Sequence, residues 1–171
     1  MDDDTEVIMK RSFGLLAACA LAAALFAAQA HEPGRDEATV ELGKGKVTIN
    51  YGTPKLNGRN LDEMIQPGTP WRLGMNDPTM LETNVPLDFA GKKLPAGKYT
   101  LFARTDEKRN WSLLICSGRT PDTAAVETPL RFTKETSPAE LLKITLAKGS
   151  QGATLLIAWG TYRLQGSFKA S

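Results

Sequence analysis

Histidine and cysteine are the residues that this chain has least of. It contains one histidine, His31, and two cysteines, Cys19 and Cys116. A Ser-His-Asp or Cys-His site needs a histidine beside its nucleophile, and His31 lies in a polar lead-in far from any candidate partner. There is also no His/Cys cluster for zinc and no glycine-rich nucleotide fingerprint. We therefore expect no metal and no cofactor, and the catalytic residues, if there are any, stay unknown.

Charge of one sign is not in excess either. The chain has 21 Lys and Arg against 19 Asp and Glu, a formal net charge of +2. Beyond residue 30 the longest cationic run is Lys92-Lys93, which is too short for a stripe that follows a phosphate backbone. We expect no nucleic-acid partner, and the mild basicity is typical of a soluble domain.

The one long apolar run lies near the N-terminus. Lys10-Arg11 precedes it, residues 13–28 are almost all Ala, Leu, Phe and Gly, and Ala28-Gln29-Ala30 offers the small residues of a signal peptidase site. The run is shorter than the roughly 20 apolar residues of a membrane span. Residues 1–30 are thus predicted to be an N-terminal extension and a cleavable signal peptide, with translation starting at Met9. The rest would be periplasmic or extracellular, without a membrane span.

A lipid anchor is the alternative form of export. Leu16-Ala17-Ala18-Cys19 resembles a bacterial lipobox, which would place the lipid on Cys19. Only Ser12–Leu15 would then separate the cations from the box, less than the usual apolar core of roughly 7 to 15 residues. Soluble export is therefore favoured.

Residues 31–171 carry strand signals separated by turns. Val47, Ile49 and Tyr51 alternate with polar residues after a Gly43-Lys44-Gly45 turn, which predicts a hairpin. Similar alternation recurs to the C-terminus, with no repeat, linker or long helix. We predict a single all-β domain, an antiparallel β-sandwich or flattened barrel of about eight strands with one long irregular loop.

Three shorter stretches carry local signals. Asn60 is placed to cap one helical turn over residues 61–65. Ser137-Pro138-Ala139-Glu140 has capping-box spacing, although the alternation beyond Leu141 favours a strand. The apolar neighbours of Cys116 indicate a buried thiol rather than a reactive one.

The irregular loop over residues 51–79 is the best candidate for a site. Its prolines exclude any long regular element, and loops of this length in small domains are usually functional or packed as Ω-loops. Arginine forks suit carboxylate or phosphate, aromatic rings offer stacking faces, and Asn or Asp can hydrogen-bond a polar ligand. The candidate ligand-binding residues are Tyr51, Arg59, Trp71, Arg72, Asn76 and Asp77.

A structural role for the same residues is the alternative. Trp71 would then plug the end of the sandwich, and the arginines would fix the loop by pairing with nearby carboxylates, namely Asp62, Glu63 or Asp77. A concave pocket with unpaired donors would favour ligand binding. Mutual salt bridges without a cavity would favour the structural role.

Several motifs in and after the loop are distinctive: Tyr51-Gly52-Thr53-Pro54, Trp71-Arg72-Leu73-Gly74-Met75-Asn76 and Leu94-Pro95-Ala96-Gly97-Lys98-Tyr99. Their order and spacing, over most of residues 38–169, resemble the bacterial exported family called domain of unknown function 2911. The resemblance implies an extracytoplasmic β-sandwich and supplies no catalytic residue. Where the family usually reads Asn-Glu-Ala-Thr, this chain reads Asn76-Asp77-Pro78-Thr79, so any role of that acid is weakened.

Three functions are compatible with these observations. The first is a non-catalytic envelope module that binds a small polar ligand, a glycan or another envelope protein. The second is a hydrolase or isomerase that works without histidine, through carboxylates and arginines of the 51–79 loop. The third is a purely structural or accessory domain.

Overall fold

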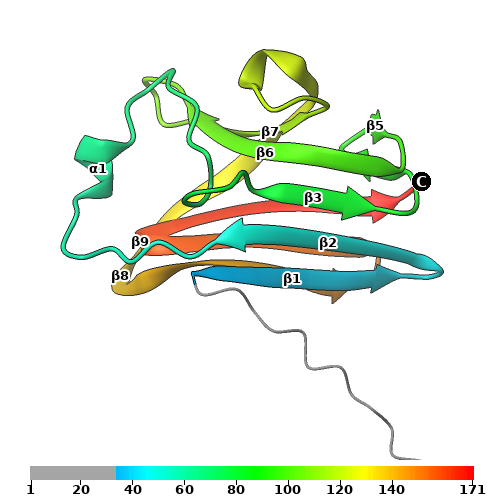
Figure 1. Ribbon diagram of the computed structural model, residues 1–171, viewed down its shortest axis with the longest axis horizontal. Coiled ribbons are helices and arrows are strands. Elements are labelled where there is room, and N and C mark those ends of the chain that lie inside the picture. The colour runs from blue at the N-terminus through cyan, green and yellow to red at the C-terminus, as the bar shows by residue number, and fades with distance from the viewer. Residues whose placement is uncertain (1–33) are drawn as a thin grey trace, which may run out of the picture. The chain divides into compact units, whose positions relative to one another are not determined.

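The structure is a computed structural model that describes residues 34–171. The predicted signal peptide, the lipobox and His31 lie outside the described residues. The described part consists of antiparallel strands with one short α-helix and one turn of 3₁₀ helix (Figure 1). The elements are β1 (Arg35–Leu42), β2 (Gly45–Gly52), α1 (Leu61–Met64), β3 (Met80–Thr83), β4 (Leu87–Phe89), β5 (Lys92–Leu94), β6 (Gly97–Thr105), β7 (Trp111–Cys116), η1 (Pro121–Thr123), β8 (Ala124–Gly149) and β9 (Gly152–Ala170).

The strands form one open sheet in the order β1-β2-β3-β6-β7-β8-β9-β4-β5. This confirms the predicted antiparallel all-β class, and the facing layers are parts of a single continuous sheet. The change of layer occurs in β8, because Leu130 is paired with β7 whereas Arg131 is paired with β9. As a result, β1 packs against β8 and β9 (Figure 1).

Strand β8 is much longer than the sequence suggests. It has 26 residues, and its partner β9 has 19. Ser137 and Pro138 lie inside β8 rather than at the start of a helix, where the register shifts between Lys134 and Ala139 and again before Lys143. Pro138 has no amide hydrogen for the sheet, and bulges are where a strand tolerates proline. The segment is therefore a strand, as the alternation of apolar and polar residues after Leu141 predicts, and not the start of a helix.

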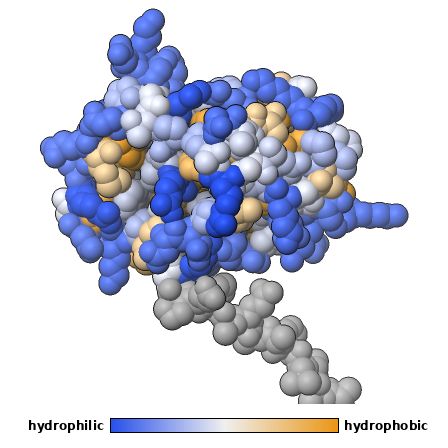
Figure 2. Space-filling model, turned by 45° about the horizontal axis from the view of Figure 1, so that its top comes forward, coloured by the Kyte–Doolittle hydropathy of each residue, from blue (hydrophilic) through white to orange (hydrophobic). Residues whose placement is uncertain are grey.

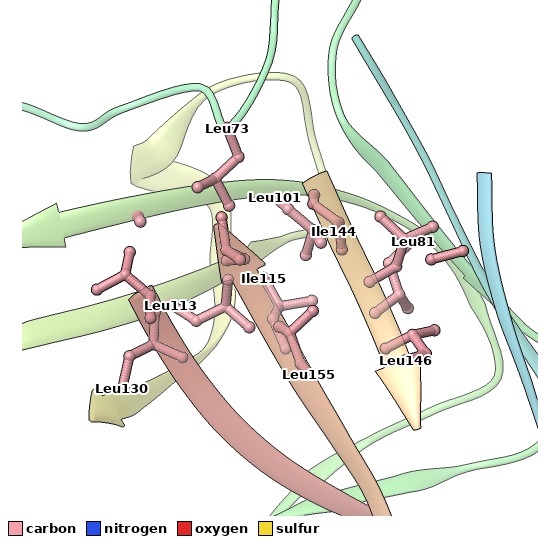
Figure 3. Close-up of a cluster of buried hydrophobic side chains, with 14 of the residues drawn as sticks. Leu73, Leu81, Leu101, Leu113, Ile115, Leu130, Ile144, Leu146 and Leu155 are labelled. Carbon is pink, nitrogen blue, oxygen red and sulfur yellow. The ribbon is translucent and has the colours of Figure 1, made fainter. Parts of the chain in front are cut away.

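The apolar core lies between the facing parts of the sheet. Figure 3 shows leucine and isoleucine side chains from several strands pointing into one cluster, with Leu73 reaching into it from the loop. Leu73 and Leu101 are almost completely buried, as is Ile144. Burying a leucine stabilises a fold by about 1.5 to 3 kcal/mol, so Leu73 attaches the irregular loop to the core.

Cys116 lies on the other side of β6 and β7. It is fully buried in a small cluster with Phe102 and Leu114. Burial raises the pKa of its thiol, which disfavours the reactive thiolate. The prediction of a buried cysteine is confirmed.

The start of the loop is hydrogen-bonded to β8. Leu56 N donates to Glu140 O at 2.6 Å, and Leu142 N donates to Pro54 O at 3.1 Å. These bonds hold the chain after β2 against the interior of strand β8. Among the described residues, no helix has the length and apolar character to cross a membrane.

Candidate ligand-binding cleft

The first half of the loop folds around α1. Asn60 caps this helix, with its Oδ1 accepting a hydrogen bond from Asp62 N at 3.0 Å. Leu61, the first residue of the helix, is buried, and so is Ile65 just after it. The predicted single helical turn and its cap are confirmed.

The second half of the loop passes very close to the end of β2. A Cβ atom on Gly52 would lie 2.7 Å from Met75 N and nearer still to Met75 O, and one on Gly74 would lie 2.8 Å from Thr79 Oγ1. Leu73 and Asn76 have φ angles of +54° and +59°. A left-handed conformation costs a non-glycine residue roughly 1 to 2 kcal/mol, which the burial of Leu73 offsets.

A cleft of about 340 Å³ lies between this loop and the part of β9 that holds Trp159. Trp71 and Trp159 form its aromatic side, and the polar side chains around it include Arg59, Arg72 and Asn76. On the molecular face shown in Figure 2, small hydrophobic patches likewise lie between strongly hydrophilic side chains. The cleft is therefore both apolar and rich in donors, as ligand sites generally are.

Three tryptophans support the cleft. Trp71 stacks on Trp159 with ring centroids 5.8 Å apart and planes 13° apart, and it meets Trp111 edge to face at 6.3 Å. The main chain of Trp71 also exchanges two hydrogen bonds with Ala103 on β6. Trp71 is half-buried while Trp159 is only 2 % exposed, so Trp71 closes the end of the core and still lines the cleft.

The two arginines of the cleft are held by main-chain oxygens. Arg59 donates from Nε to Leu56 O at 2.9 Å and from Nη2 to Lys55 O, and its guanidinium lies 5.1 Å from the Trp159 ring centroid. Arg72 donates from Nη2 to Asn76 O. The pairing with Asp62, Glu63 or Asp77 that the structural alternative expected is not among the ion pairs of the described residues, and each guanidinium group contacts backbone carbonyls instead.

Tyr51 and Asp77 lie away from the cleft. Tyr51 is 1 % exposed, donates to Ile144 O at 3.2 Å, and has its pKa raised by burial to about 12. Asp77 lines a neighbouring hollow with Arg35 and Arg119. Of the six candidate residues, the structure thus brings together Arg59, Trp71, Arg72 and Asn76.

Sequence reasoning missed Trp159 and Gln66, which also line the cleft. Trp159 sits on β9, far along the chain from the loop, and its local pattern indicated only a strand apolar on both faces. Nothing local marked it as a partner of Trp71. Gln66 directly precedes Pro67-Gly68, and nothing in the surrounding sequence marks it as a ligand contact.

Asp62 connects α1 to the body of the domain. Its carboxylate accepts hydrogen bonds from Tyr162 Oη and Lys134 Nζ, both at 2.6 Å, and Arg109 Nη2 lies 3.6 Å away. The hydrogen bonds from Lys134 and Tyr162 lower the pKa of Asp62. Its role is thus to hold the helix in place beside the cleft.

We expect Asp62→Asn to destabilise the protein by about 1 kcal/mol at pH 7, since the group is 42 % exposed and such pairs are weak. A carboxyl whose pKa is lowered by folding stabilises the fold above its unfolded pKa of about 4, and this contribution is lost as the pH falls through the folded pKa. Urea unfolding of both proteins between pH 3 and 7 should show the difference shrinking at acid pH. A difference that stays constant down to pH 3 would contradict this role.

A larger hollow, of about 530 Å³, lies between β4 and the β8–β9 turn. Among the described residues that line it, the one carboxylate is that of Asp88, which already accepts hydrogen bonds from Lys93 Nζ at 2.9 Å and Gly91 N at 2.6 Å. No tryptophan lines it. Across residues 34–171, no group of three or more acidic, histidine or cysteine side chains is placed to hold a metal ion.

Comparison with known proteins identifies a family for this chain. We found no match to the chain among curated proteins or among solved structures. The family described as "Protein of unknown function (DUF2911)" matches residues 34–168. This range includes β1, the whole irregular loop and nearly all of β9, and it confirms the resemblance seen in the motifs. The chain therefore belongs to the DUF2911 family of proteins of unknown function.

Proposed function

We propose that this protein is a non-catalytic binding module of the bacterial envelope, and that it binds a small polar ligand or a glycan unit in the cleft beside Trp71. One observation carries the proposal: an aromatic face and two fixed guanidinium groups line the same concave site. An apolar lining with a few fixed polar groups is the usual composition of a small-molecule site. The envelope location in this proposal is based on the predicted signal peptide, which would export the protein.

The side chains of the cleft support binding rather than catalysis. The described residues that line it include no Asp, Glu, His, Cys, Lys or Tyr. General acid–base catalysis needs such a group within hydrogen-bond reach of the reacting atom. The hydrolase or isomerase hypothesis relied on loop carboxylates, but Asp62 is occupied by Lys134 and Tyr162 and Asp77 lines another hollow.

The rigidity of the cleft also supports binding. Leu73 anchors the loop in the core, and Gly52 and Gly74 allow its backbone to pack directly on the end of β2. A site that is already ordered loses less conformational entropy when a ligand binds. The left-handed backbone of Leu73 fits the same interpretation, since such strain clusters at ligand sites.

A thermal-shift screen of the purified protein tests this proposal. The panel would hold neutral sugars, acidic sugars, amino acids, short carboxylic acids and phosphate esters. We expect at least one class to raise the midpoint of unfolding, because a ligand that binds only the folded state stabilises it by mass action. Trp71→Ala should abolish the shift, and Trp71→Phe, which keeps a flat ring, should retain part of it. No shift with any class at millimolar concentrations would contradict the proposal, as would an unchanged shift in Trp71→Ala.

A further inference from the structure

The arginines of the cleft lack the carboxylate partner that several other arginines of residues 34–171 have. Arg104 pairs with Glu127 at 3.0 Å, and Arg163 pairs with Glu135 at 3.2 Å. Arg59 and Arg72 contact main-chain carbonyls instead. A carbonyl oxygen fixes the direction of a guanidinium group but leaves its positive charge uncompensated. Two positive charges are thus held at the cleft without a carboxylate partner among the described residues.

Both guanidinium groups keep donors for a ligand. Arg59 uses Nε and Nη2, which leaves Nη1, and Arg72 uses Nη2, which leaves Nε and Nη1, within the contacts of residues 34–171. The planar fork of arginine matches the oxygens of a carboxylate or phosphate and binds them with charge-assisted hydrogen bonds. Arg59 packs over the Trp159 ring and is hydrogen-bonded to the backbone, so its side chain would lose less conformational entropy when a ligand binds.

The aromatic side of the cleft favours a ring. Trp71 is half-buried, stacked on Trp159, and directly precedes Arg72 in the chain. The Trp71 ring and the Arg72 guanidinium group line the same cleft of about 340 Å³, which is at the small end of known ligand pockets. This volume suits one ring-sized unit rather than a long segment of chain.

We propose that the ligand of this cleft is an anionic sugar unit, with its carboxylate or phosphate oxygens bound by Arg59 and Arg72 and one ring face packed against Trp71. This inference rests on the proposed binding function and specifies the ligand's charge. A carboxylate and a phosphate both present anionic oxygens to the guanidinium groups of Arg59 and Arg72. Sugars bearing each group distinguish the two sources.

Calorimetric titration of the purified protein with glucuronate, glucose 6-phosphate and glucose tests the proposal. We expect one or both anions to bind at least tenfold more tightly than glucose, and the difference to shrink at high salt, which screens exposed charges. Arg72→Gln should weaken anion binding at least tenfold, and Arg72→Lys, which keeps the charge but loses the fork, should lie between the two. Arg131→Gln is the matched control, because Arg131 is exposed, donates to Gln165 and lines none of the hollows described above.

The outcomes distinguish the inference that the ligand is anionic from the proposal that the cleft binds a ligand at all. If glucose binds as tightly as both anions, the anion inference is overturned while the binding function stands. If none of the three sugars binds but a neutral ligand of another class does, the sugar inference is likewise overturned. Equal weakening by Arg72→Gln and Arg131→Gln would show a general charge effect and overturn the assigned location. Thermal unfolding of each unliganded variant checks that lost binding is not lost folding.

Discussion

Replacing Gly52 with alanine is expected to destabilise the protein by about 3 kcal/mol and to remove ligand binding. The new Cβ would lie 2.7 Å from Met75 N and closer to Met75 O. Extra atoms in a packed site usually cost about 1 to 3 kcal/mol, and the upper end applies because the obstacle is main chain, which cannot rotate away. For a domain of this size the midpoint of thermal unfolding should fall by about 10 °C.

Gly149→Ala is the control for this substitution. A Cβ on Gly149 would have its nearest neighbour, Gly152 O, at 3.7 Å, an ordinary van der Waals distance. We expect its midpoint to stay within about 2 °C of the unmodified protein. Calorimetric scans of the three proteins make the comparison. A Gly52→Ala variant as stable as Gly149→Ala would mean that the loop does not pack on β2 in this way.

Trp159→Ala has the second large expected effect. Its side chain is 2 % exposed, stacks on Trp71 and lies beneath the guanidinium of Arg59. Truncation of a buried tryptophan costs about 3 to 5 kcal/mol, and the loss of both contacts should release Arg59 and Trp71 from their positions. Chemical unfolding should show the lost stability, and titration with a ligand found in the screen should show the lost binding.

The Trp159→Phe variant distinguishes the contribution of the aromatic ring from that of the indole nitrogen. Trp159 Nε1 is buried and has no hydrogen-bond partner within the described residues, so phenylalanine loses packing volume but no protein hydrogen bond. We expect it to retain more than half of the stability that Trp159→Ala loses, and to bind ligand measurably. A phenylalanine variant as impaired as the alanine variant would show that the indole nitrogen has a role that the contacts do not explain.

The strands could be predicted from the sequence because their signal is local. In β2, Val47, Ile49 and Tyr51 alternate with polar residues, and in the structure all three are buried. The change of partner between Leu130 and Arg131 could not be predicted, because it depends on which distant strands β8 meets. For the same reason the sequence divided into shorter pieces what the structure joins into one long strand.

The candidate cleft was only partly predictable. Arg59, Trp71, Arg72 and Asn76 stood out because they are chemistry-bearing residues in one irregular segment, and they do share a cleft. Tyr51 was a candidate because its ring offers a flat face for stacking, but its position on β2 turns the ring into the core. Its hydroxyl reaches Ile144 O in the opposite layer, a contact that only the folding of the sheet creates.

The binding role of the cleft is tested most directly by nuclear magnetic resonance during titrations with glucuronate and with glucose 6-phosphate. The chain has three tryptophans, so three indole N–H signals report on the aromatic cluster. We expect the Trp71 and Trp159 signals, together with backbone amides of residues 59–76, to shift most and to saturate together. Shifts confined to the hollow between β4 and the β8–β9 turn, or no saturable shift with either anion, would contradict an anionic-sugar site in this cleft.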